Sequence, residues 1–123
     1  LEGITHPAIG ERIASRVAEA QAAEDADGRT RVVVVDHPLL VESGSAAGYA
    51  TVIVVEAPVE ERVRRLVELR GMAEEDARAR IAAQADDATR RDAATHLVDN
   101  GGDPDDLVPQ VDAILVDLGV PAA

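Results

Sequence analysis

TVIVVEAPVEERVRRLVELRGMAEEDARARIAAQ, residues 51–84, is the stretch that decides the fold. Its first five residues, Thr51–Val55, form a β-branched run that favours a strand buried on both faces. Pro58 then opens a segment whose apolar residues recur at three- and four-residue spacing, which predicts an amphipathic helix. Gly71 ends that helix, and Glu74–Gln84 predicts a second one. A strand that feeds directly into helices is the repeating unit of an α/β protein.

The same alternation extends in both directions along the chain. Apolar residues at spacing four predict a helix from Pro7 to about Ala23, and the run RVVVV predicts another buried strand. Strands that alternate with helices imply a parallel sheet covered on both faces, so the predicted class is α/β. The remaining predictions are loops over Glu24–Thr30 and His37–Tyr49, the strands Arg31–Val35 and His96–Val98, and the helices Asp86–Ala93 and Asp105–Leu118.

Composition limits the classes of function. A chain of 123 residues suffices for one domain, and its formal charge of −12 argues against nucleic acid or an anionic membrane as a partner. All twelve basic residues are arginine, and the absence of cysteine fits a reducing cytoplasm. No apolar run approaches the roughly 20 residues that a membrane helix needs. The chain begins at Leu1 rather than Met, which leaves open a processed or trimmed chain and a fragment that lacks its front, and we expect the fragment.

Half of the arginines cluster in Arg62–Arg80, where six arginines against four acids give a balance of +2. The other six arginines stand against twenty acids, a balance of −14. A cationic cluster in an acidic chain suggests a bound anion such as phosphate. The alternative is a solvated helix face, because four acids precede an arginine by four residues. Spacing leaves both readings open for these pairs: Glu60–Arg64, Glu61–Arg65, Glu74–Arg78 and Asp76–Arg80.

Polar residues also follow the predicted strands, where ligands of parallel sheets bind. Asp36 and Glu42 suit a base or a helper of a metal ligand, although from the residues alone a simple turn after the strand is the favoured explanation. Asp99–Asp103 contains an Asn-Gly turn that also suits contact with a nucleobase. The three histidines lack zinc-like spacing. No G-x-x-x-x-G-K-[ST] phosphate loop is present, because the 123 residues contain no lysine.

Four blocks in order, LEGITHP, PLLVESG, the segment from Glu56 to Gln84, and LVDNGG, resemble the central and C-terminal part of bacterial dephospho-CoA kinases, in an actinobacterial style. The resemblance implies a three-layer P-loop-kinase sheet flanked by helices, here incomplete because the N-terminal strand and the phosphate loop are missing. It implies transfer of a phosphoryl group from ATP to the ribose 3′-hydroxyl of dephospho-CoA, the last step of coenzyme A synthesis. It also divides the chain into an acceptor side (1–50), a lid (about 58–85) and an adenine-side loop (99–103).

By the family pattern, the expected base and the phosphate loop lie upstream of Leu1, so no catalytic residue is assigned and residues 1–123 alone are expected to be inactive. ATP would enter with Mg²⁺ as the substrate complex, without a metal bound by the protein. Two alternatives stay open: another small-molecule P-loop kinase of the nucleotide-kinase type, and a non-catalytic nucleotide-binding module. The residues that match the family's binding positions are His6, Pro38, Leu39, Leu40 and Glu42 for dephospho-CoA, and Arg65, Arg70, Arg80, Asn100 and Gly101 for ATP.

Overall fold

A computed structural model describes the backbone of residues 2–120 and the side chains of residues 8–120. The chain forms two compact units, Leu1–His37 and Pro38–Ala123, and the boundary falls inside the region 1–50 expected to face the acceptor. Within the described part, no helix is long and apolar enough to cross a membrane.

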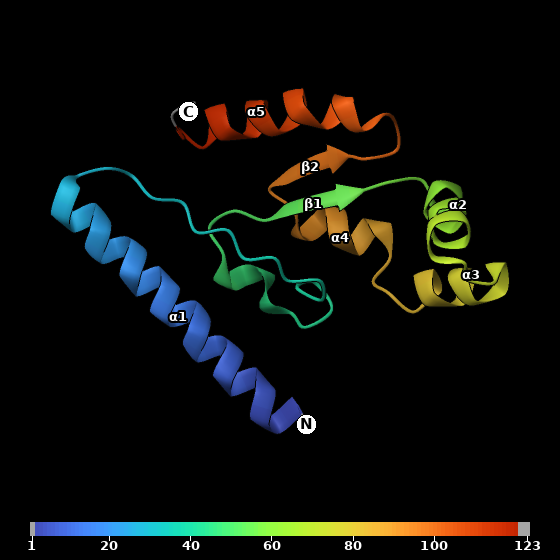
Figure 1. Ribbon diagram of the computed structural model, residues 1–123, viewed down its shortest axis with the longest axis horizontal. Coiled ribbons are helices and arrows are strands. Elements are labelled where there is room, and N and C mark those ends of the chain that lie inside the picture. Colours follow the sequence, from blue (N-terminus) through green and yellow to red (C-terminus); the bar gives the residue numbers. More distant parts are fainter. Residues whose placement is uncertain (1, 121–123) are drawn as a thin grey trace. The chain divides into compact units, whose positions relative to one another are not determined.

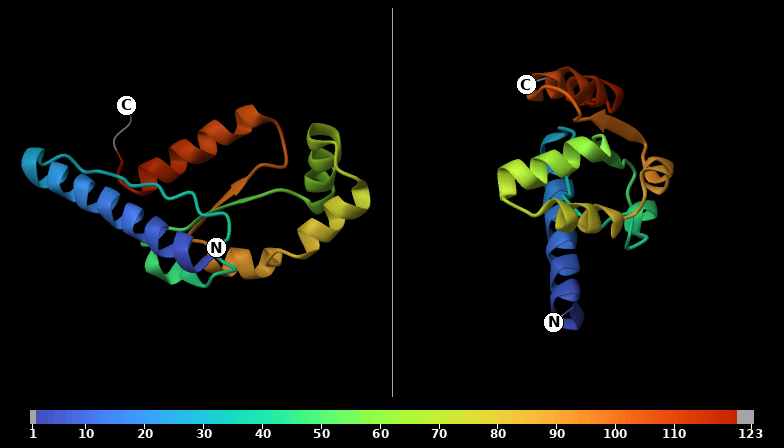
Figure 2. Two further views of the ribbon diagram at one scale, coloured as in Figure 1. Left: turned by 60° about the horizontal axis from the view of Figure 1, so that its bottom comes forward. Right: turned by 90° about the vertical axis from the view of Figure 1, so that its right-hand side faces the viewer.

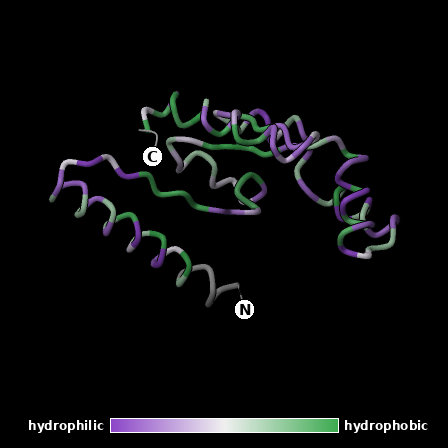
Figure 3. Tube along the Cα trace, turned by 45° about the horizontal axis from the view of Figure 1, so that its top comes forward, coloured by the Kyte–Doolittle hydropathy of each residue, from purple (hydrophilic) through white to green (hydrophobic). Residues whose placement is uncertain are grey.

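The first unit contains one long helix, α1, which spans Glu2–Asp27. The prediction of a helix here is confirmed, but the helix starts before Pro7 and continues beyond Ala23 into the predicted loop. At its end, the N–H of Gly28 donates to the carbonyl of Glu24 at 2.7 Å. Hydrophobic and hydrophilic residues alternate along α1, as its apolar spacing required (Figure 3).

The prediction of a strand over Arg31–Val35 is wrong. Residues 28–37 have no regular secondary structure, and Val34 is 85% exposed. A β-branched run favours an extended backbone, but a strand also needs a neighbour that accepts and donates the ladder hydrogen bonds. Within residues 2–120 no segment supplies that neighbour for these valines.

The second unit is built on two parallel strands, β1 (Ile53–Glu56) and β2 (His96–Asp99), with Ile53 opposite His96 and Glu56 opposite Asp99. Both predicted strands are confirmed. Figure 1 shows helices on both sides of this pair. The other elements of the unit are η1 (Ser45–Gly48), α2 (Val59–Arg70), α3 (Glu74–Ala82), α4 (Asp87–Ala93), η2 (Pro104–Asp106) and α5 (Leu107–Asp117). These confirm the four helices predicted after Pro58 and the irregular segment before Tyr49.

Helix α5 packs on β2 through both apolar and polar contacts. Ile114 of the helix is buried with Val98 of the strand. Gln110 satisfies both backbone groups of Asp99, since its Oε1 accepts from the Asp99 N–H at 2.8 Å and its Nε2 donates to the Asp99 carbonyl at 2.9 Å. His96 Nε2 lies 2.9 Å from Asp117 Oδ2 at the other end of the strand. The helix therefore contacts β2 near both ends of the strand.

Helices α2 and α3 form a hairpin beyond the carboxyl end of β1 (Figure 2). Gly71 turns the chain between them with φ 63°, a left-handed conformation that glycine adopts without steric cost. Its N–H donates to the Val67 carbonyl at 3.1 Å, which closes the last turn of α2. Ala77 of α3 is completely buried and Val63 of α2 is 4% exposed, so these small side chains form the core of the hairpin.

Candidate functional site

The loop after β2 lies against the start of α2. The N–H of Asn100 donates to the carbonyl of Glu56, the last residue of β1, at 2.7 Å. A Cβ atom on Gly101 would lie 2.8 Å from Pro58 Cδ and 3.0 Å from Asp99 Oδ1, closer than side chains approach one another. Only glycine therefore fits at position 101 without a shift of its neighbours. The structure thus brings the expected adenine-side loop next to the first residue of the expected lid.

Glu61 binds two arginines on α2. Its Oε1 accepts from Arg65 Nε at 2.6 Å and from Arg64 Nη2 at 2.6 Å, and its Oε2 accepts from Arg64 Nε at 2.8 Å. Hydrogen bonds, first from Arg64 and then from Arg65, lower the pKa of Glu61 to about 2. The carboxylate is therefore ionised at neutral pH. The predicted Glu61–Arg65 pair is confirmed.

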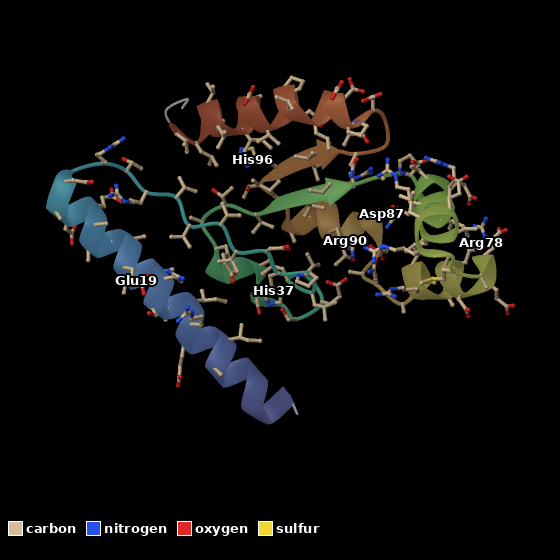
Figure 4. The ribbon with its side chains drawn as sticks, viewed as in Figure 1. Glu19, His37, Arg78, Asp87, Arg90 and His96 are labelled. Atoms are coloured by element: carbon tan, nitrogen blue, oxygen red, sulfur yellow. The ribbon has the colours of Figure 1, made fainter. Side chains whose placement is uncertain are left out.

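Arg78 joins the two helices of the hairpin. It lies between α2 and α3 (Figure 4), where its Nη2 is 2.8 Å from Glu60 Oε2 and 2.9 Å from Glu74 Oε1. The predicted Glu74–Arg78 pair is confirmed. The predicted Glu60–Arg64 pair is wrong, because Glu60 turns to Arg78 across the hairpin while Arg64 pairs with Glu61 and Glu68.

Two of the expected ATP-binding arginines pair with no acid among the described side chains. Arg70 is exposed in the last turn of α2, and Arg80 is exposed in the last turn of α3. Neither forms an ion pair within 4.0 Å among the residues whose side chains are described, so the predicted Asp76–Arg80 pair is not formed. Their guanidinium groups are open to solvent.

Helix α4 is tied to three other segments by ion pairs that spacing along the chain did not reveal. Arg62 of α2 donates to both oxygens of Asp87 at 2.9 Å, and Arg91 binds both oxygens of Glu56 at 2.8 and 2.9 Å. Arg90 Nη2 lies 3.3 Å from Glu42 Oε1; Figure 4 labels Asp87 and Arg90. The partners are 25, 35 and 48 residues apart, so only the fold brings them together.

Glu42, expected to contact dephospho-CoA, is held by protein groups. Its Oε1 accepts from the backbone N–H of Ala85 at 3.1 Å as well as from Arg90. Hydrogen bonds from its own backbone N–H, from Ala85 and from Arg90 lower the pKa of Glu42. This carboxylate thus links the turn after residue 37 to the start of α4.

The other expected acceptor-side residues are less engaged. Pro38, Leu39 and Leu40 lie in the turns that precede η1, where Leu39 is 54% exposed and Leu40 is half-buried. An exposed leucine on a turn is available for an apolar contact with a ligand. The side chain of His6 lies outside the described residues.

Comparison with known proteins places the chain among dephospho-CoA kinases. A family model described as dephospho-CoA kinase matches residues 1–106. A dephospho-CoA kinase of Mycobacterium tuberculosis strain H37Rv is 57% identical over 108 residues, which cover 88% of this chain and 25% of that protein. A Corynebacterium glutamicum dephospho-CoA kinase is 44% identical over 118 residues, which cover 96% of this chain and 58% of that protein.

A solved structure shares the fold. The crystal structure of TT1252 from Thermus thermophilus superposes with a TM-score of 0.76 at 29% sequence identity, and the match covers 95% of this chain and 57% of that one. The chain therefore spans between a quarter and about three-fifths of the length of the relatives that it matches.

Proposed function

The chain belongs to the dephospho-CoA kinase family, and from that membership we propose that it forms part of an enzyme that moves the γ-phosphoryl group of ATP to the ribose 3′-hydroxyl of dephospho-CoA. The observation that carries the proposal is the family match over residues 1–106 together with relatives of up to 57% identity. The product is coenzyme A, so the reaction is the last step of its synthesis.

The proposed ATP side lies on the second unit. Phosphoryl transfer depends mainly on positioning and on neutralising the charge of the phosphates. Arg65 is assigned to a phosphate of ATP, and the solvent-open guanidinium groups of Arg70 and Arg80 are assigned to the lid's contacts with the nucleotide. Asn100 and Gly101 are assigned to the adenine. The closeness of Gly101 to Pro58 supports this assignment, because one nucleotide can then reach both the loop and the lid. Mg²⁺ would arrive with ATP as the substrate complex.

The proposed acceptor side comprises residues 1–50. Pro38, Leu39 and Leu40 would offer apolar contact to dephospho-CoA, and His6 would contribute a polar group. Glu42 would act there by fixing the turn through Arg90 and Ala85, as its hydrogen bonds suggest.

We further propose that the complete sheet is the three-layer P-loop-kinase sheet, of which these residues supply a part. Two observations support this. One edge of β1 carries no partner strand within the described residues, and Val32–Val34 run unpaired with exposed side chains. In a complete parallel sheet the central strands are paired along both edges, and valines of this kind are covered. The phosphate loop, absent from this sequence, would accompany the missing strand.

Product analysis tests the proposed reaction. The protein expressed from its complete reading frame is incubated with dephospho-CoA and with ATP labelled with ¹⁸O in the γ-phosphoryl group. The expected product is coenzyme A whose 3′-phosphate carries the label, identified by mass spectrometry and ³¹P NMR. Label found only in inorganic phosphate, or on another hydroxyl of the acceptor, would contradict the proposal.

A further inference from the structure

Arg65 is held in its ion pair through one nitrogen. It donates to Glu61 through Nε, the nitrogen nearest the aliphatic part of the side chain, at 2.6 Å. Among the residues whose side chains are described, neither Nη group of Arg65 forms a hydrogen bond or an ion pair. These two nitrogens form one of the pairs through which an arginine can bind two phosphate oxygens in a bidentate manner.

Arg64 makes the other two hydrogen bonds to the Glu61 carboxylate. It donates through Nε and Nη2 to the two oxygens of Glu61, at 2.8 and 2.6 Å, and its Nη1 reaches Glu68. Glu61 therefore makes its bidentate pair with Arg64 and only a single contact with Arg65. Glu61 and Glu68 together balance the charges of Arg64 and Arg65, so the half-buried Arg65 is distinguished by its two Nη groups, which no described side chain occupies and which can bind an anion.

From this arrangement we propose that Glu61 is a positioning residue: it fixes the guanidinium group of Arg65 through Nε so that both Nη groups are presented to a phosphate of ATP. The inference rests on the proposed function, since it concerns the ATP site. Without Glu61 the long side chain of Arg65 would sample several rotamers, and fewer of them would meet the phosphate.

Variants of Glu61 in the protein from the complete reading frame test the proposal. Glu61→Ala removes the acceptor for Arg65 Nε, and we expect kcat/KM for ATP to fall about tenfold, a fraction of what misplacing a catalytic group can cost. Glu61→Gln retains an oxygen at the same place and is expected to recover most of that loss. Glu68→Ala is the matched control: it removes the other acid bound to Arg64 without touching Arg65 and should leave kcat/KM within about twofold, as expected for a solvent-exposed pair.

A double-mutant cycle separates positioning from general stability. If Glu61 acts through Arg65, Glu61→Ala causes no further loss in an Arg65→Ala background. An equal loss in both backgrounds would overturn the inference, and so would a rise in kcat/KM for Glu61→Ala, which would mean that Glu61 competes with ATP for Arg65. A parent protein without kinase activity, or an Arg65→Ala variant of full activity, would overturn the proposed function and this inference with it. If the parent protein is active and the Arg65→Ala variant is impaired, the proposed function stands. A failed prediction for the Glu61 variants then overturns only the positioning role of Glu61.

Discussion

Arg65→Ala in the protein from the complete reading frame is expected to lower kcat/KM for ATP by ~10²-fold or more. A single group that stabilises charge in the transition state often contributes about 2.7–4 kcal/mol, because it acts in a preorganised site. Arg65 suits that role since it is half-buried and tethered by one nitrogen only. Steady-state kinetics at several ATP concentrations, with dephospho-CoA saturating, measures the effect.

A matched control for Arg65 is available on the same protein. Arg91→Ala removes an exposed arginine of α4 that pairs with Glu56 at 2.8 Å, outside the proposed acceptor side, lid and adenine-side loop, and it should change kcat/KM little. Thermal unfolding of both variants shows whether either loses its fold. A loss of less than threefold for Arg65→Ala would mean that this arginine serves only to pair with Glu61.

The second large effect concerns residues 1–123 on their own, for which we expect no measurable conversion of dephospho-CoA. The γ-phosphate must be held in line with the acceptor hydroxyl, and P-loop enzymes do this with backbone N–H groups and a lysine. The sequence contains neither the loop motif nor any lysine. Coupled detection of ADP, with dephospho-CoA and Mg²⁺–ATP in excess, measures the rate.

The comparison requires a folded preparation. The circular dichroism spectrum of residues 1–123 should show the helical signal expected from helices α1 to α5. The protein from the complete reading frame serves as the active reference under the same conditions. Any conversion of dephospho-CoA by the isolated residues above the rate without protein would contradict the proposed division of the site.

Helices were more predictable from this sequence than strands, for a physical reason. The apolar spacing from Val59 and the stop at Gly71 are local, and the structure ends α2 at Arg70, where Gly71 follows in a left-handed conformation. The run Arg31–Val35 has equally strong strand composition, but a strand is defined by its neighbour, and no local signal reports whether that neighbour is present. Thr51–Val55 was placed correctly as a strand because β2 pairs with part of it.

The candidate site shows the same division between local and distant contacts. The Glu61–Arg65 pair follows from a spacing of four on one helix and was predicted from it. Arg78 with Glu60 and Arg90 with Glu42 join residues 18 and 48 positions apart, and periodicity carries no information at such separations. Residue spacing also does not show which acid an arginine pairs with when several are within reach. For this reason Glu60 was assigned to Arg64 instead of Arg78.

The identity of the acceptor is the central claim, and the ratio of two specificity constants tests it most directly. The protein from the complete reading frame is assayed with ATP and either dephospho-CoA or a panel of nucleoside monophosphates, and kcat/KM is measured for each acceptor. The account predicts that dephospho-CoA has the highest kcat/KM of the panel. Faster phosphorylation of any nucleoside monophosphate would contradict it and would make the protein a nucleotide kinase.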